Sequence, residues 1–333
     1  MSINETFELS ESALNGLKEA AQRGTLVPFI GAGASILAGA PSWSGFADEV
    51  LKQFITTGKF SHAQLDQLSG LSPRIKLSIG LGLEKKHGQA INHEAIFKKQ
   101  ETNSKGNSLY SDLSRLGRSF VTTNYDEWLD ESLILPSMKE AGSNGKEISP
   151  VSIKRRVVHK TEEFTSANLN HPDSVIHLHG SIQDPEGMIY TTQQYVKHYA
   201  NDHRVDDPEK ENRVLTFLES LFKEKTVVFI GYGLEELEIL EYVILKARRM
   251  PGTDRHEIKH YLVQGFFSHQ RLLMESMKQY YQDECGIELI PFLRDEKDWD
   301  ALLDVVGELA EKVPCRELMR LQEFKEMEGL LDG

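Results

Sequence analysis

Short apolar runs that end at glycine or at polar clusters recur along this chain. Residues 26–30 (Leu-Val-Pro-Phe-Ile) stop at Gly31, and residues 226–230 (Thr-Val-Val-Phe-Ile) stop at Gly231. Such continuous runs are typical of strands that are buried on both faces of a parallel sheet. The same reasoning predicts further strands over residues 119–123, near 157–158, and over 175–178, 260–263 and 288–290.

Apolar residues at helical spacing predict helices between these strands. Phe46, Val50 and Phe54 mark one helix after the first glycine-rich turn. A second carries apolar positions between 214 and 222, after an acidic cap and proline at residues 206–208. Others are predicted after Gly233, over about 298–313 and over about 315–331. Alternating strands and helices predict an α/β fold: a Rossmann-like, doubly wound parallel sheet with C-terminal helices.

Residues 1–313 are predicted to form one catalytic domain. Within it, residues 58–108 are polar with broken helical periodicity, and we interpret them as a mostly helical insertion. Residues 314–333 are predicted to form a C-terminal helix. One face of this helix carries an apolar stripe, formed by Leu318, Leu321, Phe324, Met327 and Leu331. The stripe is a candidate contact with a second copy or a partner, although such stripes more commonly pack on their own domain.

Composition narrows the function classes. The 333 residues fit one large domain or two small ones, and the formal net charge of −13 disfavours binding to nucleic-acid phosphates. The two cysteines, Cys285 and Cys315, suit a reduced compartment and are too few for a four-cysteine zinc site. No apolar run is long enough for a membrane helix and the N-terminus lacks a secretion signal, so we expect a cytoplasmic protein with no membrane contact.

Three strand ends carry candidate chemistry. Gly31-Ala32-Gly33 allows close approach to a pyrophosphate, but the next glycine is Gly39, so the usual dehydrogenase fingerprint is not met and a structural turn is equally favoured. Asn124 can hold a carboxamide, a ribose hydroxyl or a water, or form an Asx turn that caps a helix from Glu127. His179 can act as a general base, although a lone histidine is more often structural, as we interpret His177 to be.

Taken together, these blocks resemble the sirtuin family. They are residues 31–35 (Gly-Ala-Gly-Ala-Ser), Gly39-Ala40-Pro41, residues 123–126 (Thr-Asn-Tyr-Asp), His179-Gly180 and Gly231-Tyr232-Gly233, in sirtuin order and approximate spacing. The resemblance covers about residues 22–295 through short blocks and looks closest to the bacterial sirtuin-like domains of antiphage-defence systems.

The resemblance implies roles for individual residues. Asn124 would position ribose or water, His179 would act as the base, and Asp126 would hold the nicotinamide carboxamide. Ala32 and Gly33 would lie against the phosphates, and Trp43 replaces the family's aromatic residue beside the nicotinamide pocket. Gly231 and Gly233 match the segment beside the adenosine half, and Gln264 matches a residue near the adenine ribose. Gly31, Ser35 and Thr123 are the remaining implied NAD contacts.

Departures from the family pattern change the expected reaction. Deacylating sirtuins continue the glycine block with Pro-Asp-Phe-Arg, whereas this chain reads Pro41-Ser42-Trp43-Ser44. Thr123 stands where those enzymes carry glutamine, and the zinc-ribbon cysteines are missing. These differences favour an NAD glycohydrolase (NADase), in which water is the acceptor and no metal is required.

The predicted activity is therefore hydrolysis of NAD to nicotinamide and ADP-ribose, as an NAD-depleting effector of antiphage (antiviral) defence. Two alternatives stay open: an NAD-dependent deacylase or ADP-ribosyltransferase, and a non-catalytic NAD or ADP-ribose sensor. A toxic hydrolase needs restraint, so we expect a homo-oligomer or a separate sensor or ATPase subunit, HerA-like by analogy.

Overall fold

The computed structural model describes Phe7 and residues 9–98, 102–131, 133–135, 151–199, 212–233, 244, 259–313 and 315. The predicted helices after Gly233 and over 315–331, and the cap at 206–208, lie outside these ranges apart from Ile244 and Cys315. The central element is a seven-stranded sheet in the order β5-β6-β2-β1-β7-β8-β9, and every neighbouring pair of strands is parallel. The predicted doubly wound α/β fold is therefore confirmed.

The strands of this sheet are β1 (Leu26–Ile30), β2 (Phe120–Thr122), β5 (Arg156–Val158), β6 (Ser174–His177), β7 (Thr226–Ile230), β8 (His260–Phe266) and β9 (Ile287–Leu293). Each strand overlaps a predicted apolar run, although β8 and β9 extend beyond the predicted 260–263 and 288–290. A separate antiparallel pair, β3 (Leu133–Leu135) with β4 (Val151–Ile153), was not predicted from the sequence.

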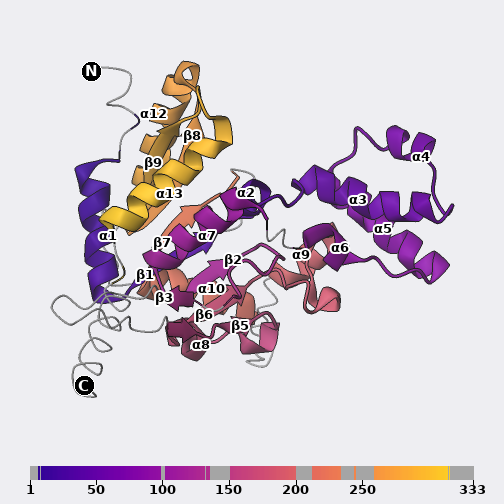
Figure 1. The fold of residues 1–333 in the computed structure, drawn as a ribbon, viewed down its shortest axis with the longest axis horizontal. Coiled ribbons are helices and arrows are strands. Elements are labelled where there is room, and N and C mark those ends of the chain that lie inside the picture. The colour runs from indigo at the N-terminus through magenta and orange to yellow at the C-terminus, as the bar shows by residue number, and fades with distance from the viewer. Residues whose placement is uncertain are drawn as a thin grey trace, which may run out of the picture.

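Helices cover both faces of the sheet (Figure 1). On one face, Val27 and Phe29 of β1 join a core shared with α8 (Ser166–Asn170), α10 (Arg213–Glu224) and α12 (Arg271–Tyr280). On the other face, Leu26 and Ile30 join α1 (Glu11–Arg23), α7 (Ser104–Leu116) and α13 (Ala301–Lys312). Side chains alternate between these two cores, which is why the strands are apolar at successive positions.

A third apolar cluster holds a helical extension beside the sheet. It is built by α3 (Trp43–Thr56), α5 (Pro73–His87) and α6 (His93–Phe97), together with buried side chains such as Tyr125 and Tyr190. Figure 1 shows α3, α4 (His62–Gln67) and α5 projecting away from the sheet. The expected helical insertion over 58–108 contains α4, α5 and α6, whereas α7 begins at Ser104 and packs on the sheet.

The remaining helical segments are short. Two of them flank the candidate site: α2 (Ala32–Leu37) and α9 (Thr192–Tyr199). The others are the single turns η2 (Thr161–Glu163), η3 (Pro185–Gly187), η5 (Ser268–Gln270) and η7 (Asp298–Asp300), and the π-helical turn η6 (Tyr281–Cys285).

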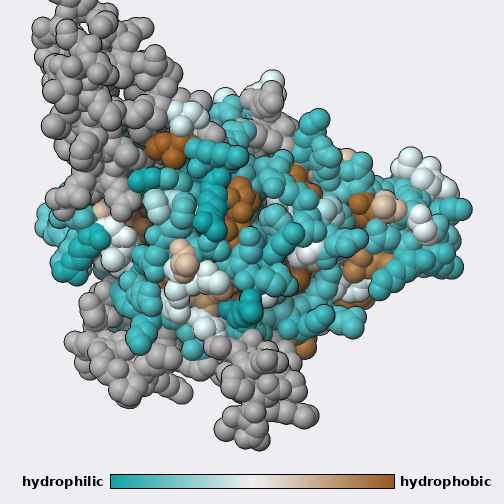
Figure 2. Space-filling view, turned by 90° about the horizontal axis from the view of Figure 1, so that it is seen from below, coloured by the Kyte–Doolittle hydropathy of each residue, from teal (hydrophilic) through white to brown (hydrophobic). Residues whose placement is uncertain are grey.

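The surface visible from below is mainly hydrophilic, and its brown, apolar areas are small and separated (Figure 2). None of the described helices is both long enough and apolar enough to cross a membrane. The described part of this face therefore offers no broad apolar surface.

Candidate functional site

Four adjacent strands end in the predicted motifs. Gly31 follows β1, Asn124 lies two residues beyond β2, His179 lies two residues beyond β6, and Gly231 follows β7. Since parallel strands present their carboxyl ends at one edge, all four motifs lie along the same edge of the sheet. From β1 the chain continues to β2, its neighbour on one side, and from β7 it continues to β8, which lies in the opposite direction along the sheet. The strand order therefore reverses between β1 and β7. Ligands of open α/β sheets bind at such a switch point.

The two Gly-x-Gly turns pack directly against each other. β1 and β7 pair with Ile30 opposite Ile230, so Gly31 and Gly231 leave the sheet side by side. The Gly31 amide donates to the Ile230 carbonyl at 2.9 Å, and the Gly33 amide donates to the Gly231 carbonyl at 2.7 Å. A Cβ atom on Gly33 would lie 2.9 Å from the Gly231 carbonyl oxygen. In this conformation, these glycines form the contact between the two turns. The amide of Gly33, a residue expected to lie against the phosphates, donates instead to a protein carbonyl.

Gly233 differs from the other glycines of the two turns. It is exposed, and a Cβ atom built on it would have no neighbour within 4 Å among the residues that the structure describes, which end here and resume at Ile244. The described part of the fold therefore does not require glycine at position 233. An open position at the switch point fits the predicted contact with a bound nucleotide.

Asn124 is buried and held from three directions. Its amide donates to the Thr122 hydroxyl at 3.0 Å, and its side-chain Nδ2 donates to the Gly31 carbonyl at 3.0 Å. Its own carbonyl lies 2.8 Å from Nδ1 of His177. The side chain is thereby fixed against the glycine-rich turn, at the end of the neighbouring strand β2.

Asp126 connects the segment after β2 to α2. The Ser35 hydroxyl donates a short hydrogen bond to Asp126 Oδ2, and the Trp128 amide donates to Oδ1 at 3.3 Å. Burial raises the pKa of the Asp126 carboxyl, while these two donors act in the opposite direction. The Asx turn expected at Asn124 thus forms at Asp126. The helix expected from Glu127 is wrong, because residues 128–130 form a turn.

His179 is buried in an aromatic environment supplied by α9. Its Nε2 lies 2.8 Å from the Tyr199 hydroxyl, and its ring contacts the Tyr195 ring edge-on at 5.0 Å between centroids. Burial, with smaller contributions from His198 and Arg74, holds the pKa of His179 well below 6.5. The imidazole is therefore neutral at pH 7, which is the protonation state that a general base needs.

The residues around His179 were missed by sequence reasoning. Tyr199 and Tyr195 come from a helix some distance along the chain, and Arg74 at the start of α5 stacks on the Tyr195 ring at 4.2 Å. No local motif marks these side chains. They become visible only when α9 folds back over the end of β6.

The remaining predicted residues spread along the same edge. Trp43 stacks on Tyr125, with ring centroids 6.4 Å apart and an interplanar angle of 21°. The Thr123 hydroxyl lies 3.0 Å from the hydroxyl of Tyr232, which sits between the two glycines of the second turn. Gln264 is buried in β8, and its Oε1 has no hydrogen-bond partner within the described part of the chain. A buried acceptor without a donor fits a ligand hydroxyl, as predicted for the adenine ribose.

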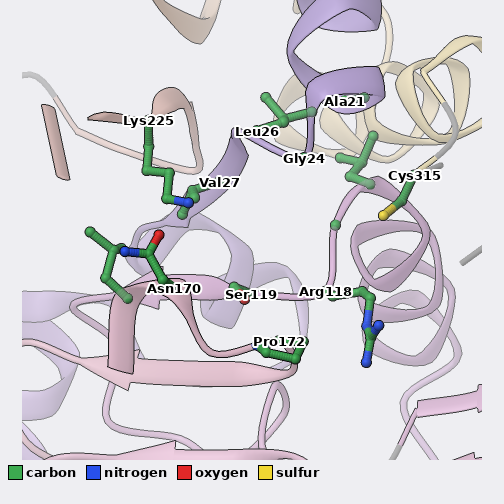
Figure 3. A pocket seen from close by; sticks show the side chains of 13 residues that line it. Ala21, Gly24, Leu26, Val27, Arg118, Ser119, Asn170, Pro172, Lys225 and Cys315 are labelled. Carbon is green, nitrogen blue, oxygen red and sulfur yellow. The ribbon is translucent and has the colours of Figure 1, made fainter. Parts of the chain in front are cut away.

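A pocket of about 220 Å³ lies at the opposite edge of the sheet (Figure 3). It opens at the amino ends of β1, β2 and β7, beside Leu26, Ser119 and Lys225. Because the four motifs lie at the carboxyl ends, this pocket is separate from the candidate site. Among the described residues, no cluster of three or more His, Cys, Asp or Glu side chains is placed to hold a metal ion.

The fold is that of a Rossmann-like α/β protein, with the candidate site at the strand switch point. A protein-family model described as SIR2-like domain matches residues 118–290, just over half of the chain. The chain belongs to the SIR2-like domain family, and this membership makes it an NAD-utilising enzyme in general terms. The match includes Asn124, His179 and Gly231, whereas Gly31 and Gly33 lie outside it. No curated protein matches the chain.

Proposed function

We propose that this chain hydrolyses NAD to nicotinamide and ADP-ribose. The observation that carries the proposal is that a fixed Asn124 and a buried, neutral His179 follow the ends of two adjacent strands, β2 and β6. Membership of the SIR2-like family supports NAD as the ligand. The carboxamide of Asn124 and the imidazole of His179 supply the hydrogen-bonding and proton-accepting groups that such a reaction needs.

The proposed reaction balances without a further reactant. A bond forms between the water oxygen and C1′ of the nicotinamide ribose, and the bond from C1′ to the pyridinium nitrogen breaks. The bonding electron pair leaves with nicotinamide, which becomes neutral, and the water proton passes to His179 and then to solvent. Because the leaving group starts as a cation, catalysis rests on positioning the water and stabilising the oxocarbenium-like ribose. Asn124 orients the ribose or the water in this scheme.

Hydrolysis is favoured over acyl transfer by the composition of the chain. With two cysteines in all, it lacks the four-cysteine zinc module that helps frame an acyl-lysine groove in deacylating sirtuins. The helical extension of α3, α4 and α5 stands beside the candidate site instead. We further propose that the hydrolase serves as an NAD-depleting effector in bacterial antiphage defence, restrained by self-association or by a partner chain.

The test is NAD loss with product identification by chromatography. We expect the purified full chain, alone or with the product of its neighbouring gene, to release nicotinamide and ADP-ribose in equal amounts. Asn124→Ala and His179→Ala should each abolish release. His62→Ala changes an exposed histidine of α4 and is the matched control, expected to act as wild type.

Three results would contradict the proposal. Wild-type turnover by Asn124→Ala or His179→Ala would remove these residues from catalysis. Nicotinamide release that requires an added protein acceptor would indicate a transferase or deacylase. Binding of NAD or ADP-ribose without turnover under any condition would indicate a sensor.

A further inference from the structure

His177 lies at the end of β6 and is completely buried, with each ring nitrogen directed at an acceptor. Nδ1 lies 2.8 Å from the Asn124 carbonyl oxygen, and Nε2 lies 2.8 Å from Asp130 Oδ1. A carbonyl oxygen only accepts, so Nδ1 must carry a proton. The ionised form of Asp130 also only accepts, so Nε2 carries a proton as well when Asp130 is ionised. In that state His177 is an imidazolium ion that donates two charge-assisted hydrogen bonds.

The electrostatic surroundings support the charged form. Burial lowers the pKa of His177, but the Asp130 carboxylate and the Asn124 carbonyl together outweigh that effect and raise it. Gln183 in turn donates to Asp130 Oδ2 at 3.3 Å. A continuous series of polar contacts thus runs from Gln183 through Asp130 and His177 to the main chain of Asn124.

This series acts on the residue that the proposed reaction most depends on. Asn124 lies two residues beyond the end of β2, so no strand pairing fixes its carbonyl. Its amide and its side chain are bound within the turns that follow β2 and β1. The bond from His177 is the contact that comes from β6, the strand that leads into His179 two residues later. His177 therefore relates the position of Asn124 to that of His179.

We propose that His177 is a positioning residue for Asn124, acting through its Nδ1 donor to the Asn124 carbonyl. This inference rests on the proposed NAD hydrolysis. It assigns a function to a side chain that the sequence pattern alone classes as structural. His177 touches neither water nor ribose in this scheme. Its effect is exerted on the orientation of the Asn124 carboxamide relative to the ribose, and therefore on kcat more than on KM.

Two variants test the two hydrogen-bond donors of His177, Nδ1 and Nε2, one at a time. In His177→Asn the side-chain Nδ2 takes the place of Nδ1 and retains the donor to Asn124. In His177→Gln the side-chain Nε2 takes the place of the ring Nε2 and retains only the donor to Asp130. Both variants lose the positive charge and should lose similar thermal stability. A difference in kcat between them therefore reports positioning and is independent of stability.

We expect His177→Asn to keep kcat within about threefold of wild type. His177→Gln should lower kcat by about 30- to 100-fold with KM changed less than about twofold, in line with the effect of a displacement of about 1 Å at a reacting group. Because an uncompensated Asp130 carboxylate could impair folding, each change is also made together with Asp130→Asn, which removes that charge. The same ordering is expected in the double variants. Equal kcat values for the Asn and Gln forms would overturn the proposal.

Hydrogen exchange across residues 122–126 supplies a readout that needs no turnover. We expect exchange in this segment to be faster in His177→Gln than in His177→Asn. If wild type does not cleave NAD, the proposed function fails, and the exchange comparison still decides whether His177 holds this segment. Equal exchange in the two variants would show that the bond to Asn124 does not order it, and would overturn the inference independently of activity.

Discussion

A single methyl group at Gly231 tests how the two glycine-rich turns are assembled. Gly231 has φ +73°, in the left-handed region that disfavours residues with a Cβ atom. A Cβ atom there would lie 2.7 Å from the Ala34 amide nitrogen and 3.2 Å from the Gly31 carbonyl oxygen. Both neighbours are main-chain atoms in the turn after β1, so a side-chain rotation cannot relieve the overlap.

The expected loss of stability follows from these two effects. Placing alanine in the left-handed region costs about 1–2 kcal/mol. Forcing an extra methyl group into a packed interior costs a further ~1–3 kcal/mol. Gly231→Ala should therefore lower the free energy of unfolding by about 2–5 kcal/mol, which is a large part of the ~5–15 kcal/mol of a typical native protein.

Urea denaturation followed by circular dichroism measures this loss, with Gly233→Ala as the matched control. Gly233 lies in the same turn, has no positive φ and meets none of the described residues at its Cβ position, so alanine there should change stability by less than about 0.5 kcal/mol. If a nucleotide lies beside Gly233, the control variant should instead raise KM for NAD. Equal stability of Gly231→Ala and Gly233→Ala would refute the packing of the turns described above.

Three further predictions concern the candidate site. Ser35→Ala removes the donor to the buried Asp126 carboxylate and should lower the free energy of unfolding by about 1–3 kcal/mol in urea denaturation; no change would mean that Asp126 finds another donor. Because the pKa of His179 is held well below 6.5, the rate of NAD hydrolysis should stay level as the pH falls through 6.5 and decline only at lower pH; an acid limb centred at or above 6.5 would exclude this histidine as the base. The same shift implies that stability falls as the pH drops below 6.5, since the unfolded chain binds a proton that the folded His179 does not. Tyr199→Phe frees His179 Nε2 from a hydroxyl that competes with water, so kcat should rise by up to about tenfold, the equivalent of one hydrogen bond; a fall in kcat would show that the hydroxyl assists the reaction.

The sheet could be predicted because its strands are buried on both faces. Continuous apolar runs then mark each strand, and the glycine or polar residue after the run marks its carboxyl end. The amphipathic helix α1 also left a signal in the sequence, because Ala13, Leu17, Ala20 and Ala21 recur at helical spacing and are buried. This helix was not among those predicted from the sequence.

Contacts between distant segments could not be predicted in this way. Tyr199 reaches His179 only because α9 folds back over the end of β6, and Ser35 reaches Asp126 only because β1 and β2 are adjacent. The charge of His177 likewise depends on Asp130, whose proximity follows from the turn after Asn124. Local spacing identifies which side chains can do chemistry, and the fold decides their protonation states and partners.

The recurrence of Gly-x-Gly has a structural cause that also bears on recognition of NAD. The two turns leave neighbouring strands in register and bind each other through main-chain atoms, so Gly31, Gly33 and Gly231 are required by that contact. A motif explained by packing says little about the ligand. We therefore expect recognition of NAD to rest on groups along this edge that the described residues leave without a contact, such as Gly233 and the Oε1 of Gln264. Variants at these two positions should therefore affect NAD affinity more than stability, with the reverse at Gly231.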